Sequence, residues 1–455
     1  MTTAFIGCGA GFSGDRFDAA VPVVATLAEA HGPRFLIYEV LAERTLAIAQ
    51  RLKREQPGQG YSPFLDQYLP LVLSDCHRLG IRIVTNMGSA NPLGAARRVL
   101  ELARQLGIRK LKVAAVTGDD LLTSLSEAQV REHPTFEGIP LGNLPILAAN
   151  VYLGAQPVAR ALDTGADVVM VGRTTDAALS LGPLLYVHGW KEDQLDLLAQ
   201  GTICGHLLEC GAQVTGAYFA DPGFKDVPEL ARVGFPIGEV SANGEVIISK
   251  AAGTGGLVNR ATVIEQLLYE VHDPHNYLTP DVTLDIGDVT VEQVGPDRVR
   301  VAGARGKKPP ATLKSTVCVD TGWLGEAEIS YAGPNALARA ELAAASVRER
   351  CRIIGITDTA RIEVLGTQAM FDDNRHQRRS RVPLPADGEY RVRAAIRSRD
   401  RGIAQRVADE VLSLYCSGPA GGAGVRQSVT PQIGTASILV GRDQVDPQVT
   451  LLTDD

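Results

Sequence analysis

Short apolar runs that alternate with amphipathic helical patterns are the feature that most constrains the fold of the first part of the chain. The predicted strands cover 3–7, 34–38, 81–85, 111–117, 145–151 and 167–171, and predicted helices lie near 18–31, 40–54, 63–79, 92–106, 155–164 and 176–188. Strand–helix–strand units of this kind form parallel sheets with right-handed crossovers. We therefore predict an α/β domain over 1–220, a doubly wound, Rossmann-like parallel sheet with a ligand site at the C-terminal ends of its strands.

After about residue 220 the pattern changes to short segments in which apolar and polar residues alternate. These segments cover 281–288, 290–294, 298–302 and 311–320, and helical patterns follow over 334–353 and 402–416. Strict alternation is typical of antiparallel sheets with one buried face. Because 455 residues also exceed the ~250–300 at which one core stops growing, we predict a second, α+β domain over 221–455. The polar, Arg-rich segment 371–388 is predicted to be a loop.

Composition and charge exclude several classes of function. The net charge of −7 disfavours nucleic-acid binding, which needs a basic surface. No run approaches the ~18 uninterrupted apolar residues of a membrane span, so no membrane association is expected. The chain enters its first strand at once, with no basic segment and no long apolar leader, which predicts a cytoplasmic protein.

Cysteine and histidine spacing gives no sign of a metal centre. The seven cysteines are scattered and include no CxxC pair, as expected of reduced thiols. The eight histidines include no HxH and no HExxH, and His272 and His275 straddle Pro274 in a turn-like segment. We predict that no metal is bound.

Polar residues follow the predicted strands at the point where each strand ends. Ligands of open α/β sheets bind at this edge, so these residues form the predicted site. They are Gly9, Gly11, Gly14, Asp15 and Arg16 after the first strand, Glu39 after the second, Asn86, Gly88 and Asn91 after the third, Asp119 after the fourth, Asn150 at the fifth, and Arg173 and Asp176 after the sixth. Helix capping by the Asn and Asp residues, and tight turning at the glycines, are the alternative interpretations of each position taken singly.

The first loop also contains G-x-G-x-x-G, from Gly9 to Gly14, and Glu39 ends the next strand. This arrangement is found in dinucleotide-binding proteins, where an acid about 20 residues further on binds a ribose. Glu39 lies somewhat beyond that spacing, and Asp15 places a carboxylate where a pyrophosphate would approach. A dinucleotide-dependent oxidoreductase is therefore the alternative prediction.

The second part of the chain carries two further features that suit anions. Gly255 and Gly256 belong to a glycine cluster before a predicted helix, which suits an anion at a helix N-terminus or a plain turn. Arginines alternate along 390–399 on one face of a predicted strand. They indicate a solvated face or subunit contact, or else a phosphate-rich ligand such as coenzyme A.

The motifs at these loops resemble the acyclic terpene utilisation (AtuA) family over nearly the whole chain. The matching motifs are GAGFSGDR from Gly9, YEVLAERT from Tyr38, TNxGxxNP from Thr85, GRxxDxALxLGP from Gly172, the cluster Gly253–Gly256, YLxPDV from Tyr277 and GPAGG from Gly418. The resemblance implies modification of branched, unsaturated acyl chains as coenzyme A thioesters. Some long family members carry an additional small C-terminal domain that this sequence does not include, which implies either a separate small partner subunit or no need for one.

These observations lead to a hydratase or lyase that needs no metal and acts on a branched unsaturated acyl thioester or carboxylic acid. Hydration of such a double bond needs a carboxylate to activate water, an acid to deliver a proton, and donors for the enolate oxygen. We predict Glu39 and Asp176 as the acid–base pair, Asn86 and the Gly88 backbone as the enolate donors, and Arg173 and Arg16 as contacts to an anionic group. No cofactor is required beyond coenzyme A as part of the substrate, and we expect a homo-oligomer.

A non-catalytic acyl-binding subunit of a larger complex is the third hypothesis. Co-purification with a stoichiometric partner, and no turnover alone, would distinguish this hypothesis from the two enzymatic ones.

Overall fold

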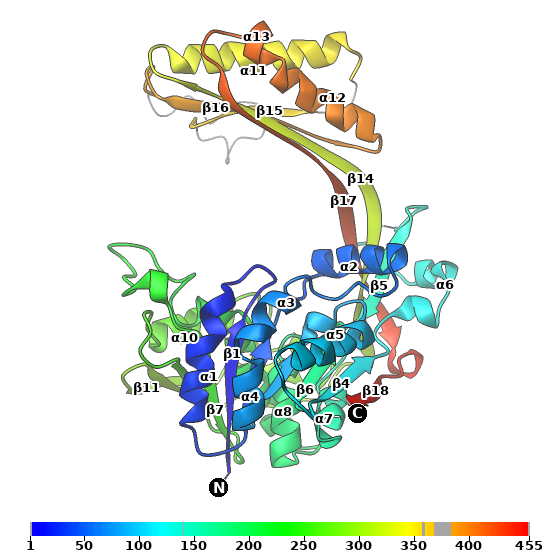
Figure 1. Ribbon diagram of the computed structural model, residues 1–455, viewed down its shortest axis with the longest axis vertical. Coiled ribbons are helices and arrows are strands. Elements are labelled where there is room, and N and C mark those ends of the chain that lie inside the picture. Colours follow the sequence, from blue (N-terminus) through cyan, green and yellow to red (C-terminus); the bar gives the residue numbers. More distant parts are fainter. Residues whose placement is uncertain (1, 139, 357–359, 368–383, 454–455) are drawn as a thin grey trace. The chain divides into compact units, whose positions relative to one another are not determined.

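The protein is an α/β protein in a computed structural model that describes residues 2–138, 140–356, 360–367 and 384–453. It forms two compact units (Figure 1). The first comprises Met1–Gly142, Ile146–Cys318 and Thr435–Asp455, and the second comprises Asn143–Pro145 and Val319–Gly434. The predicted division at residue 220 does not coincide with these units, because strands that follow residue 220 join the sheet of the first unit.

The first unit is built on a ten-stranded mixed sheet of order β11-β12-β8-β7-β1-β2-β3-β6-β4-β18. Its centre is parallel and contains β1 (Thr3–Ala10), β2 (Arg34–Tyr38), β3 (Arg82–Thr85), β6 (Val168–Val171) and β4 (Lys112–Thr117). Antiparallel strands flank it: β7 (Pro236–Ser241), β8 (Val246–Lys250), β12 (Arg298–Ala302) and β11 (Thr290–Gly295) beside β1, and β18 (Gln448–Thr453) beside β4.

The parallel centre agrees with the predicted strand–helix–strand pattern, but the prediction of a wholly parallel sheet is wrong. The sequence pattern predicts antiparallel strands over 290–294 and 298–302, which are β11 and β12. The pairing of β7 with β1 and of β12 with β8 joins strands far apart in the sequence and leaves no local signal, so their place in this sheet could not be predicted. The predicted strand 145–151 exists as β5 (Ile146–Val151), but it pairs with β14 (Thr312–Ala332) instead of joining the parallel strands.

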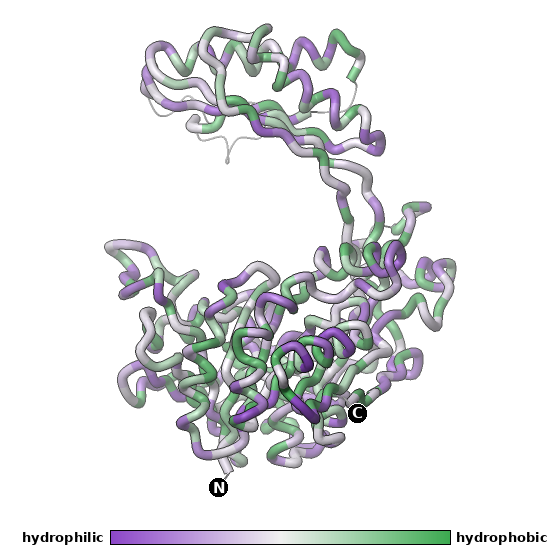
Figure 2. The backbone as a smooth tube through the Cα atoms, viewed as in Figure 1, coloured by the Kyte–Doolittle hydropathy of each residue, from purple (hydrophilic) through white to green (hydrophobic). Residues whose placement is uncertain are grey.

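Helices cover the sheet of the first unit. They are α1 (Ala20–Ala28), α2 (Glu43–Glu55), α3 (Leu65–Tyr68), α4 (Leu73–Leu79), α5 (Pro92–Gln105), α6 (Glu127–Glu132), α7 (Gln156–Asp163), α8 (Ala178–His188), α9 (Leu195–Glu209) and α10 (Arg260–Leu268). Hydrophobic and hydrophilic residues alternate along α5, which has one face in the core (Figure 2). The predicted helix 63–79 is interrupted at Leu69–Leu71, where Pro70 cannot donate a helical hydrogen bond.

A small three-stranded sheet completes the first unit. It contains β13 (Arg305–Lys307), β10 (Thr283–Asp285) and β9 (Tyr277–Leu278) in that order, with antiparallel pairing throughout. The end of α9 lies against it, since the ring of Tyr277 packs at 5.6 Å from the ring of His206.

The second unit is an antiparallel sheet with helices packed on it. The sheet has the order β15-β16-β14-β17, with β15 (Arg361–Leu365), β16 (Glu389–Ser398) and β17 (Ala423–Gly441). The helices are α11 (Ala336–Ile353), α12 (Arg401–Leu412) and α13 (Leu414–Ser417), and their alanines and valines share a core with the sheet. Both long helices are therefore present. The segments predicted as antiparallel strands over 281–288, 290–294 and 298–302 lie in the first unit, as β10, β11 and β12, and only 311–320 falls in β14. Most of the predicted loop 371–388 lies outside the described residues.

Two arginines of β16, Arg391 and Arg393, are engaged in ion pairs across this sheet. Arg391 pairs with Glu328 of β14, and Arg393 pairs with Glu326 of β14 and Glu363 of β15. Opposite charges on neighbouring strands stabilise a sheet locally. These contacts favour the solvated-face interpretation over a site for the phosphates of coenzyme A.

The parallel centre predicts a sharp contrast between two identical substitutions. Ile37 in β2 is fully buried, whereas Ile48 in α2 is 50% exposed. We expect Ile37→Ala to lower the free energy of unfolding of the first unit by about 2–5 kcal/mol, because it leaves a cavity in a close-packed core. Ile48→Ala should change it by less than about 0.5 kcal/mol. Urea unfolding followed by circular dichroism tests this, and equal losses would contradict the placement of β2.

Candidate active site at the carboxyl ends of the parallel strands

The order of the parallel strands brings three predicted loops together. β2, β3 and β6 are neighbours, so the residues that follow them share one edge of the sheet (Figure 1). Glu39 follows β2, Asn86 follows β3, and Arg173 follows β6. The sequence pattern predicted this edge as the site, and the structure brings Glu39, Asn86, Arg173 and Asp176 together there.

Glu39 is held rigidly by the backbone and by Asn86. Its Oε1 accepts hydrogen bonds from the Leu41 amide (3.0 Å) and from Asn86 Nδ2 (2.8 Å). Asn86 is fully buried, and its Oδ1 accepts from the Val40 amide at 2.8 Å. Asn86 therefore positions Glu39, and this replaces its predicted role as a donor to an enolate oxygen.

Arg173 is a buried positive charge at the centre of the site. Its side chain is 2% exposed and pairs with Asp176 at 2.5 Å. It also donates to the carbonyl oxygens of Leu41 and Thr174, and its guanidinium lies 4.2 Å from the ring centroid of Tyr152. These contacts use one N–H on each guanidinium nitrogen, so Arg173 fixes the charge and geometry of the site, and its direct contact to a substrate anion stays a prediction.

A hydrogen-bonded pair of a carboxylate and a tyrosine also adjoins Arg173. The Tyr152 hydroxyl donates to Glu43 of α2 and accepts from Thr316 Oγ1 (3.3 Å). Lys314 of β14 lies over the same ring at 4.9 Å. The sequence pattern placed Glu43 and Tyr152 near these strand ends without giving them a role. Lys314 was missed, because only the pairing of β5 with β14 brings it there.

The two central carboxyl groups have different proton affinities from free side chains. Burial raises the pKa of Glu39 well above its usual range, the charge of Asp176 raises it further, and Arg173 opposes the rise. Partial desolvation also raises the pKa of Asp176, whose side chain is 37% exposed, with Arg173 opposing and Glu43 adding to the rise. Because Asp176 forms the direct ion pair with Arg173, it loses its proton before Glu39 does.

Asp119 holds the backbone of Arg173 in place through a hydrogen bond. It is buried, and its Oδ2 accepts from the Arg173 amide (2.8 Å) and from Asn150 Nδ2 (2.8 Å). Gln50 of α2 donates in turn to Asn150 Oδ1 at 3.3 Å. Burial raises the pKa of Asp119 to about 6 in spite of these bonds. Asp119 and Asn150 therefore brace the loop, and neither is placed to contact a ligand directly.

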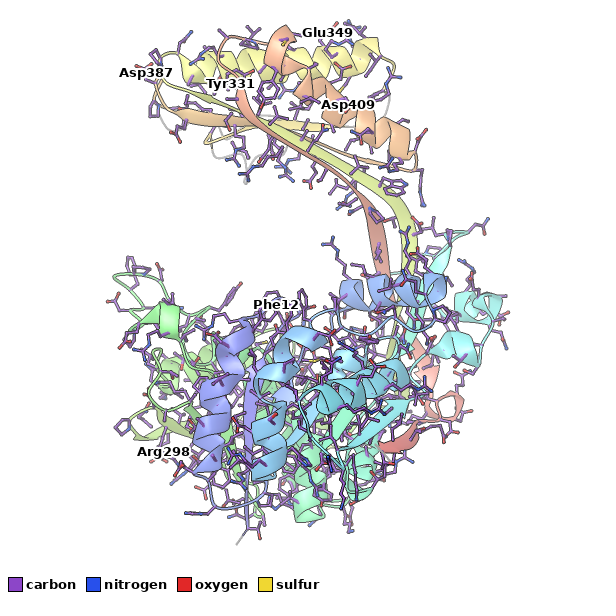
Figure 3. The ribbon with its side chains drawn as sticks, in the orientation of Figure 1. Phe12, Arg298, Tyr331, Glu349, Asp387 and Asp409 are labelled. Atoms are coloured by element: carbon purple, nitrogen blue, oxygen red, sulfur yellow. The ribbon has the colours of Figure 1, made fainter. Side chains whose placement is uncertain are left out.

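In the loop after β1, the Asp15 carboxylate binds backbone amides of the same loop. Asp15 accepts from the amides of Gly11 (2.9 Å) and Arg16 (2.9 Å), so it occupies the backbone donors that a pyrophosphate would need. Arg16 donates to the carbonyl oxygens of Ala231 (3.0 Å) and Val233 (2.6 Å). The predicted contact of Arg16 with a substrate anion is therefore replaced by a structural one, and the dinucleotide alternative is disfavoured. Phe12 in this loop is 60% exposed and lies at the surface of the first unit (Figure 3).

Three other predicted binding residues serve packing or capping. A Cβ on Gly9 would lie 2.6 Å from the ring of Tyr38, and one on Gly88 would lie 2.4 Å from the Val171 carbonyl oxygen. Gly88 is buried in that contact, which removes the support for its predicted role at an enolate oxygen. Asn91 caps α5, accepting from the Gly94 amide at 3.0 Å, as the capping alternative expected.

The remaining predicted glycines are not arranged around the carboxylates. The amides of Gly255 and Gly256 donate to the carbonyl oxygens of Arg232 (2.8 Å) and Pro228 (2.8 Å), so they are not free for an anion. Gly14 is exposed in the first loop, where a Cβ would meet only the ring of Phe12. These positions shape turns, which is the alternative that the sequence left open.

A buried histidine–glutamate pair on α9 was missed entirely. His206 Nδ1 lies 3.0 Å from Glu209 Oε1, and the two side chains are 4% and 10% exposed. Their spacing of three residues on a helix was visible in the sequence. Nothing local showed that the end of α9 contacts the loops after β1 and β6.

Together, these features define an α/β protein with a carboxylate–arginine site at the carboxyl edge of a mixed sheet. The chain belongs to the family described as acyclic terpene utilisation family protein AtuA, whose family model matches residues 4–451. Comparisons with curated proteins and with solved structures gave no match.

Two absences among the described residues concern membrane spans and metal sites. Within those ranges, no helix has the length and apolar character needed to cross a bilayer. In the same part of the chain, no group of three or more His, Cys, Asp or Glu side chains is arranged to hold a metal ion. That the protein binds no metal stays a prediction.

The raised pKa of Glu39 predicts a pH dependence of stability. The folded protein binds this proton more tightly than the unfolded chain, whose pKa is 4.5, so the stabilisation is present below that pH and is lost as the pH rises toward the folded pKa. Glu39→Gln should remove this pH-dependent loss of stability. The free energy of unfolding should then fall less steeply above about pH 4.5, by up to about 1.4 kcal/mol per pH unit.

Urea titrations at several pH values measure that slope. Glu55→Gln is the matched control, because the Glu55 side chain lies at the end of α2 and is 57% exposed. If Glu39→Gln and Glu55→Gln gave the same slope as the unchanged protein, Glu39 would ionise normally in the folded state.

Proposed function

We propose that this protein is a hydratase or lyase that adds water to, or removes it from, a branched unsaturated acyl group. The observation that carries the proposal is the pair of carboxyl groups on Glu39 and Asp176, fixed around the buried charge of Arg173. Family membership adds the chemical class, because acyclic terpenes are branched, unsaturated carbon chains. The reaction as proposed needs no metal.

The environments of the two carboxyl groups suggest different roles. Asp176 is paired with Arg173 and its side chain is 37% exposed, so it is the ionised group that reaches solvent and accepts a proton from water. Glu39 accepts both of its hydrogen bonds on Oε1, which leaves Oε2 to carry the proton that its raised pKa retains. Glu39 is therefore the acid and Asp176 the base.

In the hydration direction, the water oxygen bonds to the β-carbon of the double bond while one water proton passes to Asp176. The electron pair of the double bond takes the proton of Glu39 at the α-carbon. One water molecule is added in total, and solvent exchange returns the proton from Asp176 to Glu39. Dehydration is the same sequence reversed, with Glu39 as base and Asp176 as acid.

The acyl group is proposed as either a coenzyme A thioester or a free acid. Arg391 and Arg393 of β16, which would have supported phosphate binding, are paired with Glu326, Glu328 and Glu363. Coenzyme A therefore enters the proposal only as part of the substrate.

Turnover of purified protein with branched enoyl thioesters and the corresponding acids tests the proposal. We expect the mass gain of one water molecule in the product, detected by mass spectrometry. Glu39→Gln and Asp176→Asn should each lower kcat by about 10²–10⁴-fold, the usual contribution of a general acid or base. Glu55→Gln should retain the activity, because Glu55 lies on the exposed face of α2.

Unchanged activity in both site variants would rule out this acid–base pair. Binding of thioesters without turnover, together with co-purification of a stoichiometric partner, would instead establish a non-catalytic acyl-binding subunit.

A further inference from the structure

The C-terminal turn of α9 lies against two of the loops that form the site. A Cβ on Gly205 would lie 2.6 Å from both Cα and the carbonyl oxygen of Ala177, the residue that follows Asp176. A Cβ on Gly11 would lie 2.3 Å from the carbonyl carbon of Cys210, just beyond α9. Both contacts require glycine, so α9 reaches closer to the site than a helix with ordinary side chains could.

His206 and Glu209 occupy this turn and form a buried pair. The distance from His206 Nδ1 to Glu209 Oε1 is 3.0 Å, and both residues lie in the core beside the ring of Tyr277. His206 Nε2 is buried with no regular hydrogen-bond partner among the described residues, although the backbone of Leu267 favours the charged ring. A buried ionisable pair of this kind is costly, and neither member has a role in the acid–base step above.

The pKa values of both members of the pair are shifted, and the charge of Asp176 contributes to the shift of Glu209. Burial raises the pKa of Glu209 to about 7, His206 opposes the rise, and the charge of Asp176 adds to it. Burial alone would lower the pKa of His206, but the hydrogen bond and charge of Glu209 raise it. The other groups that face the pair are Glu270, Tyr277 and Cys210.

We propose that His206 and Glu209 are a positioning pair whose charge state is coupled to that of Asp176, so that α9 tunes the protonation of the site. Electrostatic coupling between two groups is reciprocal: a charge on Glu209 that disfavours ionisation of Asp176 is itself disfavoured by ionised Asp176. The role of Asp176 as a base rests on the proposed function, whereas the coupling itself does not.

Nuclear magnetic resonance of protein labelled at the histidine rings tests the coupling without any assay of activity. The signal of His206 is identified by its loss in His206→Asn. Asp176 raises the pKa of Glu209, and ionised Glu209 raises the pKa of His206. In Asp176→Asn, Glu209 ionises more readily, so the titration midpoint of His206 should move to higher pH. Asp176→Glu should restore it, because this substitution keeps the charge.

Asp281→Asn is the matched control. Asp281 is another carboxylate of the first unit, but both of its oxygens accept from the Ala155 amide and it is not among the groups that shift the pKa values of the pair. A midpoint in Asp176→Asn that equals that of the unchanged protein, or that moves as much in Asp281→Asn, would overturn the proposal. Thermal unfolding confirms that each variant is folded before its titration is interpreted.

If the protein turns over an acyl substrate, a second measurement is available. Glu209→Gln removes a charge that faces Asp176, so the acidic limb of the rate profile should move to lower pH. A merely structural role would lower kcat equally at all pH values and leave the limb in place. If no substrate is turned over, the proposed function fails while the titration of His206 still decides the coupling.

Discussion

The site depends on one buried guanidinium. Removing a charged group from water costs several kcal/mol unless partners compensate for it, and Arg173 is only 2% exposed. Asp176 supplies the charge, while carbonyl oxygens of Leu41 and Thr174 and the face of Tyr152 supply the remaining contacts. Since these partners lie on separate segments, Arg173 holds the loops after β2, β5 and β6 in one arrangement.

The strand order explains how these loops reach the same arginine. β6 lies between β3 and β4, although it follows both in the sequence. Asp119, after β4, can therefore bind the Arg173 amide on one side, while Asn86, after β3, holds Glu39 on the other. A sheet with β6 at its edge would leave Arg173 without one of these neighbours.

The sequence predicted the elements of the fold better than their pairing. Periodicity identified the strands and helices of the parallel centre, but it contained nothing about β18 joining β4 or β5 joining β14, which are long-range pairings. At the site, the rule that ligands bind at carboxyl ends correctly brought Glu39, Arg173 and Asp176 together. It could not predict that Arg16 would bind carbonyl oxygens of residues more than 200 positions away, because hydrogen-bond partners of that kind are set by tertiary structure.

The balance of charges around Arg173 explains why this cluster retains a proton. Asp176 is paired with Arg173. Burial raises the pKa of Glu43, but a hydrogen bond from Tyr152 helps to lower it, and Lys314 is also near. Glu39 is the third carboxyl group. Arg173 already faces Asp176, and Lys314 already faces Glu43. Ionising Glu39 would place an uncompensated charge in a poorly solvated position. A cluster of three carboxyl groups and two cations, of which Arg173 is buried and Lys314 is exposed, is therefore most stable with one proton on Glu39, the proton that the proposed acid–base step uses.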